Sequence, residues 1–165
     1  MIRYLNGTSE YGIFYGTNAN SSIEPLGYVD ASHARCPDTR RSRYGGCFKV
    51  NGGLVQWQSK MQQIVALSSM ESEYIGACEQ VRSGVWLQRF MTEIGQGSAK
   101  PIRIGIDNKS AITFAEERII QNRSKHIDTK YHYIRECIAD NKVKLFHQPM
   151  ENAPKNTSCK LLFNI

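Results

Sequence analysis

The stretch VALSSMESEYIGA, residues 65–77, marks the point where the sequence changes from the period of strands to that of helices. Ser68 and Glu71 stand three residues apart as S-x-x-E, the capping box that begins many helices. Apolar residues then recur at helical spacing as far as Ile94, and Gly95 and Gly97 follow. The pattern predicts one long helix over 68–94.

The residues before this helix predict an antiparallel start to a sheet. Strands are expected over 26–32, 44–50 and 54–58, and Asn51-Gly52-Gly53 joins the last two. Asn-Gly between apolar runs is the strongest short-range hairpin signal. An earlier short strand is expected over 11–15, followed by a polar linker over 16–24, so the main domain should begin near Pro25.

The residues after the long helix alternate between strands and helices. Strands are expected over 102–106 and 142–147, and helices over 108–118 and 127–140. An antiparallel hairpin that leads into strand–helix–strand units predicts an α/β fold with a mixed sheet covered by helices.

Composition narrows the class of protein. The 165 residues suit one ordinary domain, and no apolar run approaches the ~18–20 residues that span a bilayer. Five scattered cysteines without a CxxC pair argue against a disulfide framework or zinc finger, and predict an intracellular protein with reduced thiols. The net charge of +6 favours a polyanionic partner, most often nucleic acid.

Three acids stand at unusual places, on three different predicted elements. Asp30 lies within a strand, Asp107 ends a strand, and Glu71 lies in the first turn of the long helix. Each has an ordinary structural explanation: Glu71 as a capping residue, Asp107 as an N-cap, and Asp30 as a solvent-facing residue of an edge strand. Taken together they are candidates for a shared ligand-binding site, because carboxylates at the carboxyl ends of strands face the ligand-binding crevice of α/β sheets.

The sequence also resembles a known family, the RNase H domain of Ty1/copia-type retrotransposon Pol polyproteins. Matching stretches run in order across the chain, and residues 2–15 resemble the chain that leaves the reverse transcriptase in the same polyproteins. The stretches are GYVDA (27–31), PDTRRSRYGG (37–46), the hairpin from NGG to WQSK (51–60), VALSSMESEYIGA (65–77), IDNKSAI (106–112) and RSKHIDTKYHYIRE (123–136).

The resemblance implies an RNase H-like mixed five-stranded sheet with helices on both faces. It implies a connecting segment over 1–24 and the RNase H-like domain over 25–165, with an altered or truncated C-terminal helix. It also implies hydrolysis of the RNA strand of RNA–DNA hybrids by two Mg²⁺ or Mn²⁺ ions. The family's metal ligands carry over to Asp30, Glu71 and Asp107, with Glu73 as the second choice for the helix position.

The chain departs from the family at the fourth acid, where Asn156 stands. An amide offers a carbonyl oxygen without negative charge, so the second ion should bind more weakly. The alternative hypothesis is therefore a decayed RNase H fold that only binds nucleic acid. A serine hydrolase using Ser68 or Ser69 is the weakest alternative, because the sequence has no G-x-S-x-G motif.

Substrate contacts are expected from small polar and basic residues beside the acids. Hybrids are recognised through phosphates, the shallow minor groove and the 2′-hydroxyl. The expected partners are an RNA–DNA hybrid and the reverse transcriptase of the same polyprotein, with no membrane and no small-molecule cofactor. The expected location is the cytoplasm or retrotransposon particles, with the nucleus as the alternative. The candidate contacts are Ser69, Asn108, Lys109, Ser110, Arg40, Arg41, Lys125 and His126.

Overall fold

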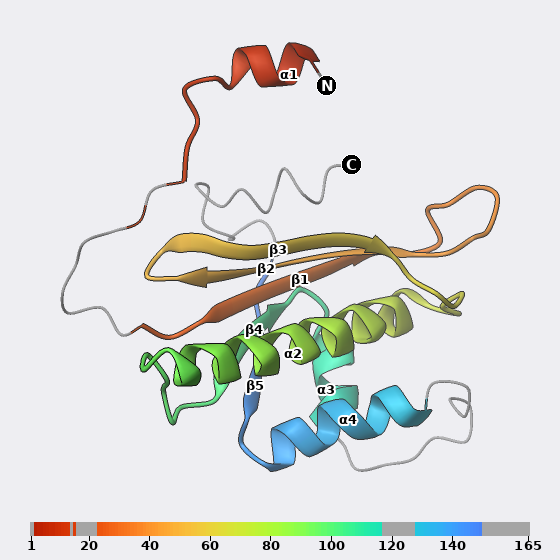
Figure 1. The fold of residues 1–165 in the computed structure, drawn as a ribbon. Coiled ribbons are helices and arrows are strands. Elements are labelled where there is room, and N and C mark those ends of the chain that lie inside the picture. The colour runs from red at the N-terminus through yellow and green to blue at the C-terminus, as the bar shows by residue number, and fades with distance from the viewer. Residues whose placement is uncertain (1, 14, 16–22, 117–127, 150–165) are drawn as a thin grey trace.

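A five-stranded mixed sheet forms the centre of the molecule (Figure 1). The computed structural model describes residues 2–13, 15, 23–116 and 128–149. The strands lie in the order β3-β2-β1-β4-β5. Their bounds are β1 Leu26–Ser32, β2 Arg43–Val50, β3 Gly53–Met61, β4 Ile102–Ile106 and β5 Val143–His147.

The pairing of the strands confirms the predicted mixed sheet. β1, β2 and β3 pair antiparallel, whereas β4 pairs parallel with β1 and with β5. The hairpin between β2 and β3 turns at Asn51 and Gly52, whose φ angles are +54° and +81°. Two consecutive positive φ angles are what a type I′ turn requires, so the Asn-Gly pair fixes the register of the hairpin.

Three helices pack on one face of this sheet (Figure 1). They are α2 (Ser69–Glu93), α3 (Lys109–Glu116) and α4 (Asp128–Ala139). The short α1 (Ile2–Gly7) stands apart, beyond the opposite face. Within the described ranges, none of the helices is both long and apolar enough to cross a membrane.

The long helix α2 carries most of the apolar packing against the sheet. Its buried residues Tyr74, Cys78 and Val81 meet Val29 and Ile104 of the central strands in one core. The helix ends in a Schellman motif, in which Gln96 N–H donates to Met91 O and Gly95 N–H donates to Thr92 O, at 2.7 and 3.0 Å. Gly95 has a φ of +77°, which explains the glycine at this position.

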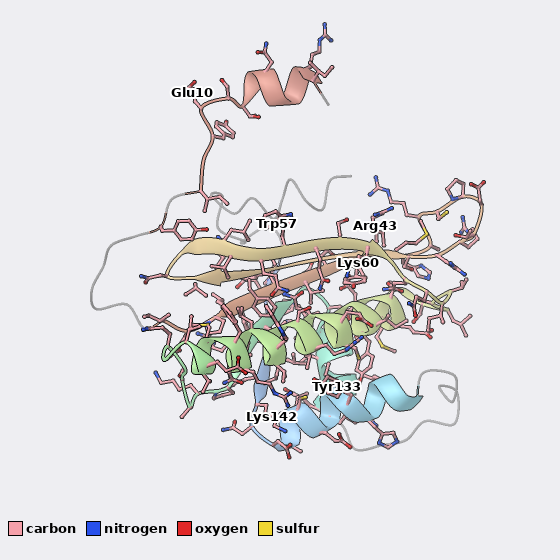
Figure 2. The ribbon with its side chains drawn as sticks, viewed as in Figure 1. Glu10, Arg43, Trp57, Lys60, Tyr133 and Lys142 are labelled. Atoms are coloured by element: carbon pink, nitrogen blue, oxygen red, sulfur yellow. The ribbon has the colours of Figure 1, made fainter. Side chains whose placement is uncertain are left out.

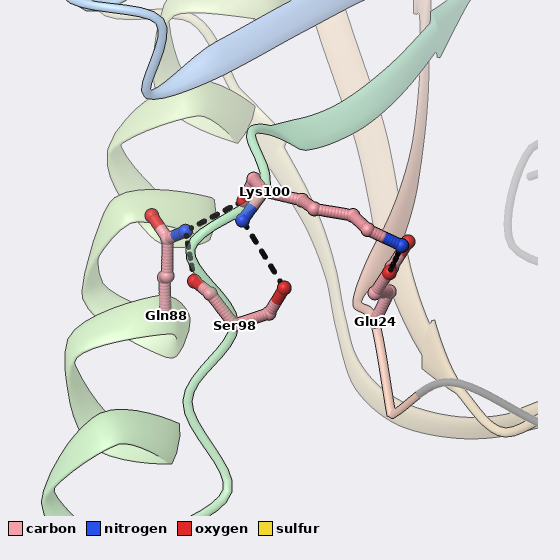
Figure 3. A network of polar contacts seen from close by, with 4 residues as sticks. All are labelled: Glu24, Gln88, Ser98 and Lys100. Carbon is pink, nitrogen blue, oxygen red and sulfur yellow. Dashed lines mark hydrogen bonds and ion pairs between the residues drawn. The ribbon is translucent and has the colours of Figure 1, made fainter.

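A polar network then ties the loop after α2 to the start of the sheet (Figure 3). Gln88 Nε2 donates to the carbonyls of Ser98 and Lys100, at 3.3 and 3.0 Å. Lys100 Nζ in turn pairs with Glu24 Oε1 at 2.6 Å, just before β1. The network links the residues just before β4 to the residues just before β1.

Two sequence predictions are wrong. Residues 11–13 and 15 form no strand; Tyr15 instead donates from its hydroxyl to Leu54 O at 2.8 Å. An aromatic side chain packed on the hairpin gives the same local pattern as a strand residue. The expectation of reduced thiols also fails at Cys47, which is disulfide-bonded, although Cys36, Cys78 and Cys137 are not.

Candidate active site

The parallel pairing of β1 and β4 places two of the predicted acids side by side. Val29 lies opposite Ile106 in the register of the two strands. Asp30 and Asp107 follow these residues directly, so both stand where the parallel pairing ends: Asp107 immediately after β4, and Asp30 within β1. This edge of an α/β sheet is where such folds bind their ligands.

The third acid at this edge is Glu73 of α2. The backbone N–H of Ala31 donates to Glu73 Oε1 at 3.2 Å, which ties the helix to β1 one residue beyond Asp30. The Glu73 side chain is only 7% exposed. Its other oxygen, Oε2, is buried and has no hydrogen-bond partner. Asp30 is half-buried and Asp107 is exposed.

Burial raises the proton affinity of two of these carboxyl groups, Glu73 and Asp30. Burial, and then the charge of Asp30, raise the pKa of Glu73 to about 8, and the charge of Asp107 adds to the shift. Burial also raises the pKa of Asp30, although the neighbouring Glu73 side chain lowers it. Within the described part of the chain, no Lys or Arg forms an ion pair with any of the three. The site is therefore an uncompensated cluster of acids that favours either a proton or a cation.

Glu71 does not lie with Asp30. Its Oε2 accepts a hydrogen bond from Leu67 N–H at 2.7 Å, and its own N–H donates to Ser68 Oγ at 3.1 Å. Both contacts are those of a helix cap, so Glu71 stabilises the start of α2. The first choice for the helix acid is thereby replaced by the second, Glu73. The capping box was visible in the sequence, but it did not show which glutamate packs against β1.

The cap at Ser68 makes a direct prediction about stability. Ser68→Ala removes the acceptor for Glu71 N–H, and an N-cap serine replaced by alanine costs about 1 kcal/mol. We expect a loss of that size in the free energy of unfolding, measured by urea denaturation. Ser69→Ala is the matched control, since the Ser69 side chain is exposed and the residue accepts only through its backbone carbonyl. Equal losses in the two variants would contradict the assigned cap.

Helix α3 is capped by Asn108, and the Asp107 carboxylate takes no part in this cap. Ala111 N–H donates to Asn108 Oδ1 at 3.1 Å, so the ordinary N-cap explanation of Asp107 does not apply. His147, at the end of β5, contacts the backbone carbonyl of Asp107 through Nε2 at 3.1 Å. No local pattern selects His147, because only the β4–β5 register brings it there.

The other predicted contacts flank the same edge of the sheet. Ser69 begins α2 and Lys109 and Ser110 begin α3, and all three side chains are exposed. Arg40 and Arg41 are exposed in the loop that follows β1 (Figure 1). Three further predicted residues lie outside the described ranges: Lys125, His126 and Asn156.

As the side chains lie, no group of three or more His, Cys, Asp or Glu residues within the described ranges is arranged to hold a metal ion. Asp30 and Glu73 form a close pair, and Asp107 acts on both through its charge. The donor set is nevertheless all carboxylate, the kind that hard divalent cations prefer. The unpartnered Glu73 Oε2 offers one such donor directly.

Comparison with known proteins agrees with this geometry. The retrovirus-related Pol polyprotein from transposon TNT 1-94 of Nicotiana tabacum is 35% identical over 164 residues, which cover 98% of this chain. The corresponding polyprotein from transposon RE2 of Arabidopsis thaliana is 28% identical over the whole chain. The chain spans only 12% and 11% of the lengths of these relatives. No family model matches the chain.

Solved structures identify the fold. The N-terminal RNase H domain of rv2228c from Mycobacterium tuberculosis superposes with a TM-score of 0.59 at 12% identity, covering 87% of this chain and 92% of that one. LC11-RNase H1, solved in complex with an RNA/DNA hybrid, has a TM-score of 0.57 at 14% identity, covering 86% and 94%. This chain is a homologue of transposon Pol polyproteins with the RNase H fold. The RNase H fold thus brings Asp30, Glu73 and Asp107 to one edge of its sheet.

Proposed function

We propose that this chain is a ribonuclease H domain that hydrolyses the RNA strand of RNA–DNA hybrids. The observation that carries the proposal is the convergence of Asp30, Glu73 and Asp107 at the carboxyl edge of the sheet, in a fold of the RNase H type. The homology to Pol polyproteins supports a role in reverse transcription, where such hybrids arise.

Asp30, Glu73 and Asp107 are the proposed ligands for divalent metal ions, Mg²⁺ or Mn²⁺. Three carboxylates without basic partners fit a cation, because bound positive charge would offset the burial and the repulsion that raise the pKa of Glu73. When bound, such ions activate a water molecule and stabilise the charge that develops on the leaving 3′ oxygen. Glu73 would release its proton as the site fills.

The surrounding residues would hold the hybrid. Lys109, exposed beside Asp107, is suited to contact a phosphate as a point charge. Arg40 and Arg41 would bind the backbone from the loop after β1, with the salt dependence typical of phosphate contacts. The proposed substrate places this activity inside the cell, in the cytoplasm or in retrotransposon particles, next to the reverse transcriptase of the same polyprotein.

The test of the proposal is cleavage of a labelled RNA–DNA hybrid with Mg²⁺ or Mn²⁺. We expect the RNA strand to be cut. Asp30→Asn should lower the cleavage rate at least ~100-fold, because loss of a metal ligand should cost more than loss of an outer-shell partner. Chelation by EDTA should abolish the cleavage. Cleavage that persists in Asp30→Asn or in EDTA would exclude the proposed site.

A second candidate function is nucleic-acid binding without cleavage. It is favoured by Asn156, which stands where the family has its fourth acid and lies outside the described residues. Asn156→Asp restores a negative charge, so we expect faster cleavage and saturation at a lower metal concentration. If the unaltered protein binds the hybrid in a salt-dependent way without cleaving it, and Asn156→Asp restores cleavage, the second function would replace the first.

A further inference from the structure

A groove of about 560 Å³ runs between β3 and α2, on the flank of the helix. Gln62, Gln63 and Ile75 lie at the end where α2 begins, and Trp86 lies at the other end, since β3 and α2 run in opposite directions past each other. Trp86 lies 13 residues beyond Glu73 on α2, so the groove extends about 20 Å from the acidic cluster. The full lining is Tyr44, Gln56, Gln58, Lys60, Met61, Gln62, Gln63, Ile75, Glu79, Arg82, Ser83 and Trp86.

The lining of this groove is rich in hydrogen-bonding groups that a ligand could use. Gln58 Nε2 makes only long hydrogen bonds, 3.4 Å to Gln80 Oε1 and 3.4 Å to Ser83 Oγ. Such bonds are at the limit of hydrogen-bond geometry and are readily exchanged for shorter ones. The Gln58 side-chain amide can therefore donate hydrogen bonds to a polar ligand in the groove.

Two cations border the groove. Lys60 is exposed on the side of β3 that faces α2 (Figure 2). Arg82 projects from α2 with its side chain 65% exposed, although its Nη1 also pairs with Glu79 at 3.0 Å. Arg89 lines a second hollow of about 510 Å³ on the other side of Trp86, between α2 and α4. Basic side chains thus lie on both sides of Trp86: Lys60 and Arg82 along the groove, and Arg89 in the second hollow.

An exposed aromatic pair closes the groove. The rings of Trp86 and Phe90 stack with a centroid distance of 5.6 Å and an interplanar angle of 9°. Trp86 is 58% exposed and Phe90 is 45% exposed. A flat aromatic surface flanked by Lys and Arg is the platform on which single-stranded nucleic acids stack their bases.

We propose that this groove binds a single-stranded segment of nucleic acid, with an unpaired base stacked on Trp86 and phosphates held by Lys60 and Arg82. The inference deepens the proposed function, since it rests on a nucleic-acid substrate at the nearby acids. A single strand that continues beyond the hybrid would follow the groove away from the cleavage edge. The groove would then favour hybrids with a single-stranded overhang over blunt ones.

The two tryptophans of the chain allow a matched test. Trp57 is 57% exposed, nearly the same as Trp86, but it lies on the face of β3 away from α2 (Figure 2). In Trp57→Phe the sole tryptophan is Trp86, and in Trp86→Phe it is Trp57, so fluorescence excited at wavelengths that only tryptophan absorbs reports on one position. We expect short single-stranded poly(dT) to quench the fluorescence of Trp57→Phe but not that of Trp86→Phe, with an effect that weakens as salt rises.

Binding provides the second measurement. Trp86→Ala should weaken the binding of an overhang hybrid about fivefold or more, the loss expected for one stacked base, and should leave a blunt hybrid unaffected. Trp57→Ala should change neither. The proposal would be overturned if poly(dT) quenched both single-tryptophan variants or neither of them. It would also be overturned if Trp86→Ala and Trp57→Ala lost equal affinity for the overhang hybrid. Hybrid cleavage without quenching of Trp86 would reject the groove alone, whereas quenching without cleavage would reject the catalytic proposal alone.

Discussion

Glu73→Gln is expected to reduce hybrid cleavage by at least ~100-fold, whereas Glu71→Gln should leave the rate close to that of the unaltered protein. The two changes are chemically identical and lie two residues apart on the same helix. Glu73 reaches β1 beside Asp30, and its carboxylate is the buried donor proposed for a metal ion. Glu71 is engaged in the cap, and glutamine serves in a capping box as well as glutamate.

The measurement is the initial rate of RNA-strand cleavage across a range of Mg²⁺ concentrations. Extra metal should not rescue Glu73→Gln fully, because the amide cannot replace the charge. Glu71→Ala separates stability from chemistry: it should lower the free energy of unfolding yet cut hybrid at temperatures where it stays folded. A large rate loss in Glu71→Gln with normal cleavage by Glu73→Gln would reverse the assignment.

The metal-free protein is expected to lose stability as the pH rises from about 4.5 to about 8. The pKa of Glu73 is raised from an ordinary 4.5 to about 8 in the folded chain. Between those values the folded state binds more protons than the unfolded state, so deprotonation favours unfolding. The loss should be on the order of a few kcal/mol and complete above the folded pKa. Urea denaturation in EDTA at several pH values measures it.

Glu73→Gln is the control for this pH dependence. Its amide does not ionise, so the stability of the variant should fall much less over the same range and should exceed that of the unaltered protein at alkaline pH. Divalent cation should reverse the order, because it stabilises only a site that can bind it. An unaltered pH dependence in Glu73→Gln would show that Glu73 is not the group that titrates.

Much of the fold could be predicted from local patterns. The strand over 26–32 and the strand over 102–106 were predicted with their observed bounds, because buried strands give short apolar runs that turn residues delimit. The hairpin followed from Asn51-Gly52, whose backbone angles few other residues adopt without strain. The false strand over 11–15 shows the limit of the method, since Tyr15 is held by a contact with Leu54, distant in sequence.

The sequence by itself determined the elements, their caps and turns, and two of the three acids, because these depend on residues close along the chain. It could not decide between Glu71 and Glu73, because a helix offers both and only the packing of α2 against β1 shows which carboxylate meets Asp30. The tertiary structure alone brought Asp107 beside Asp30, His147 beside Asp107, and Trp86 to the end of a polar groove. Each of these contacts joins residues far apart in sequence, where register and packing decide and local patterns carry no information.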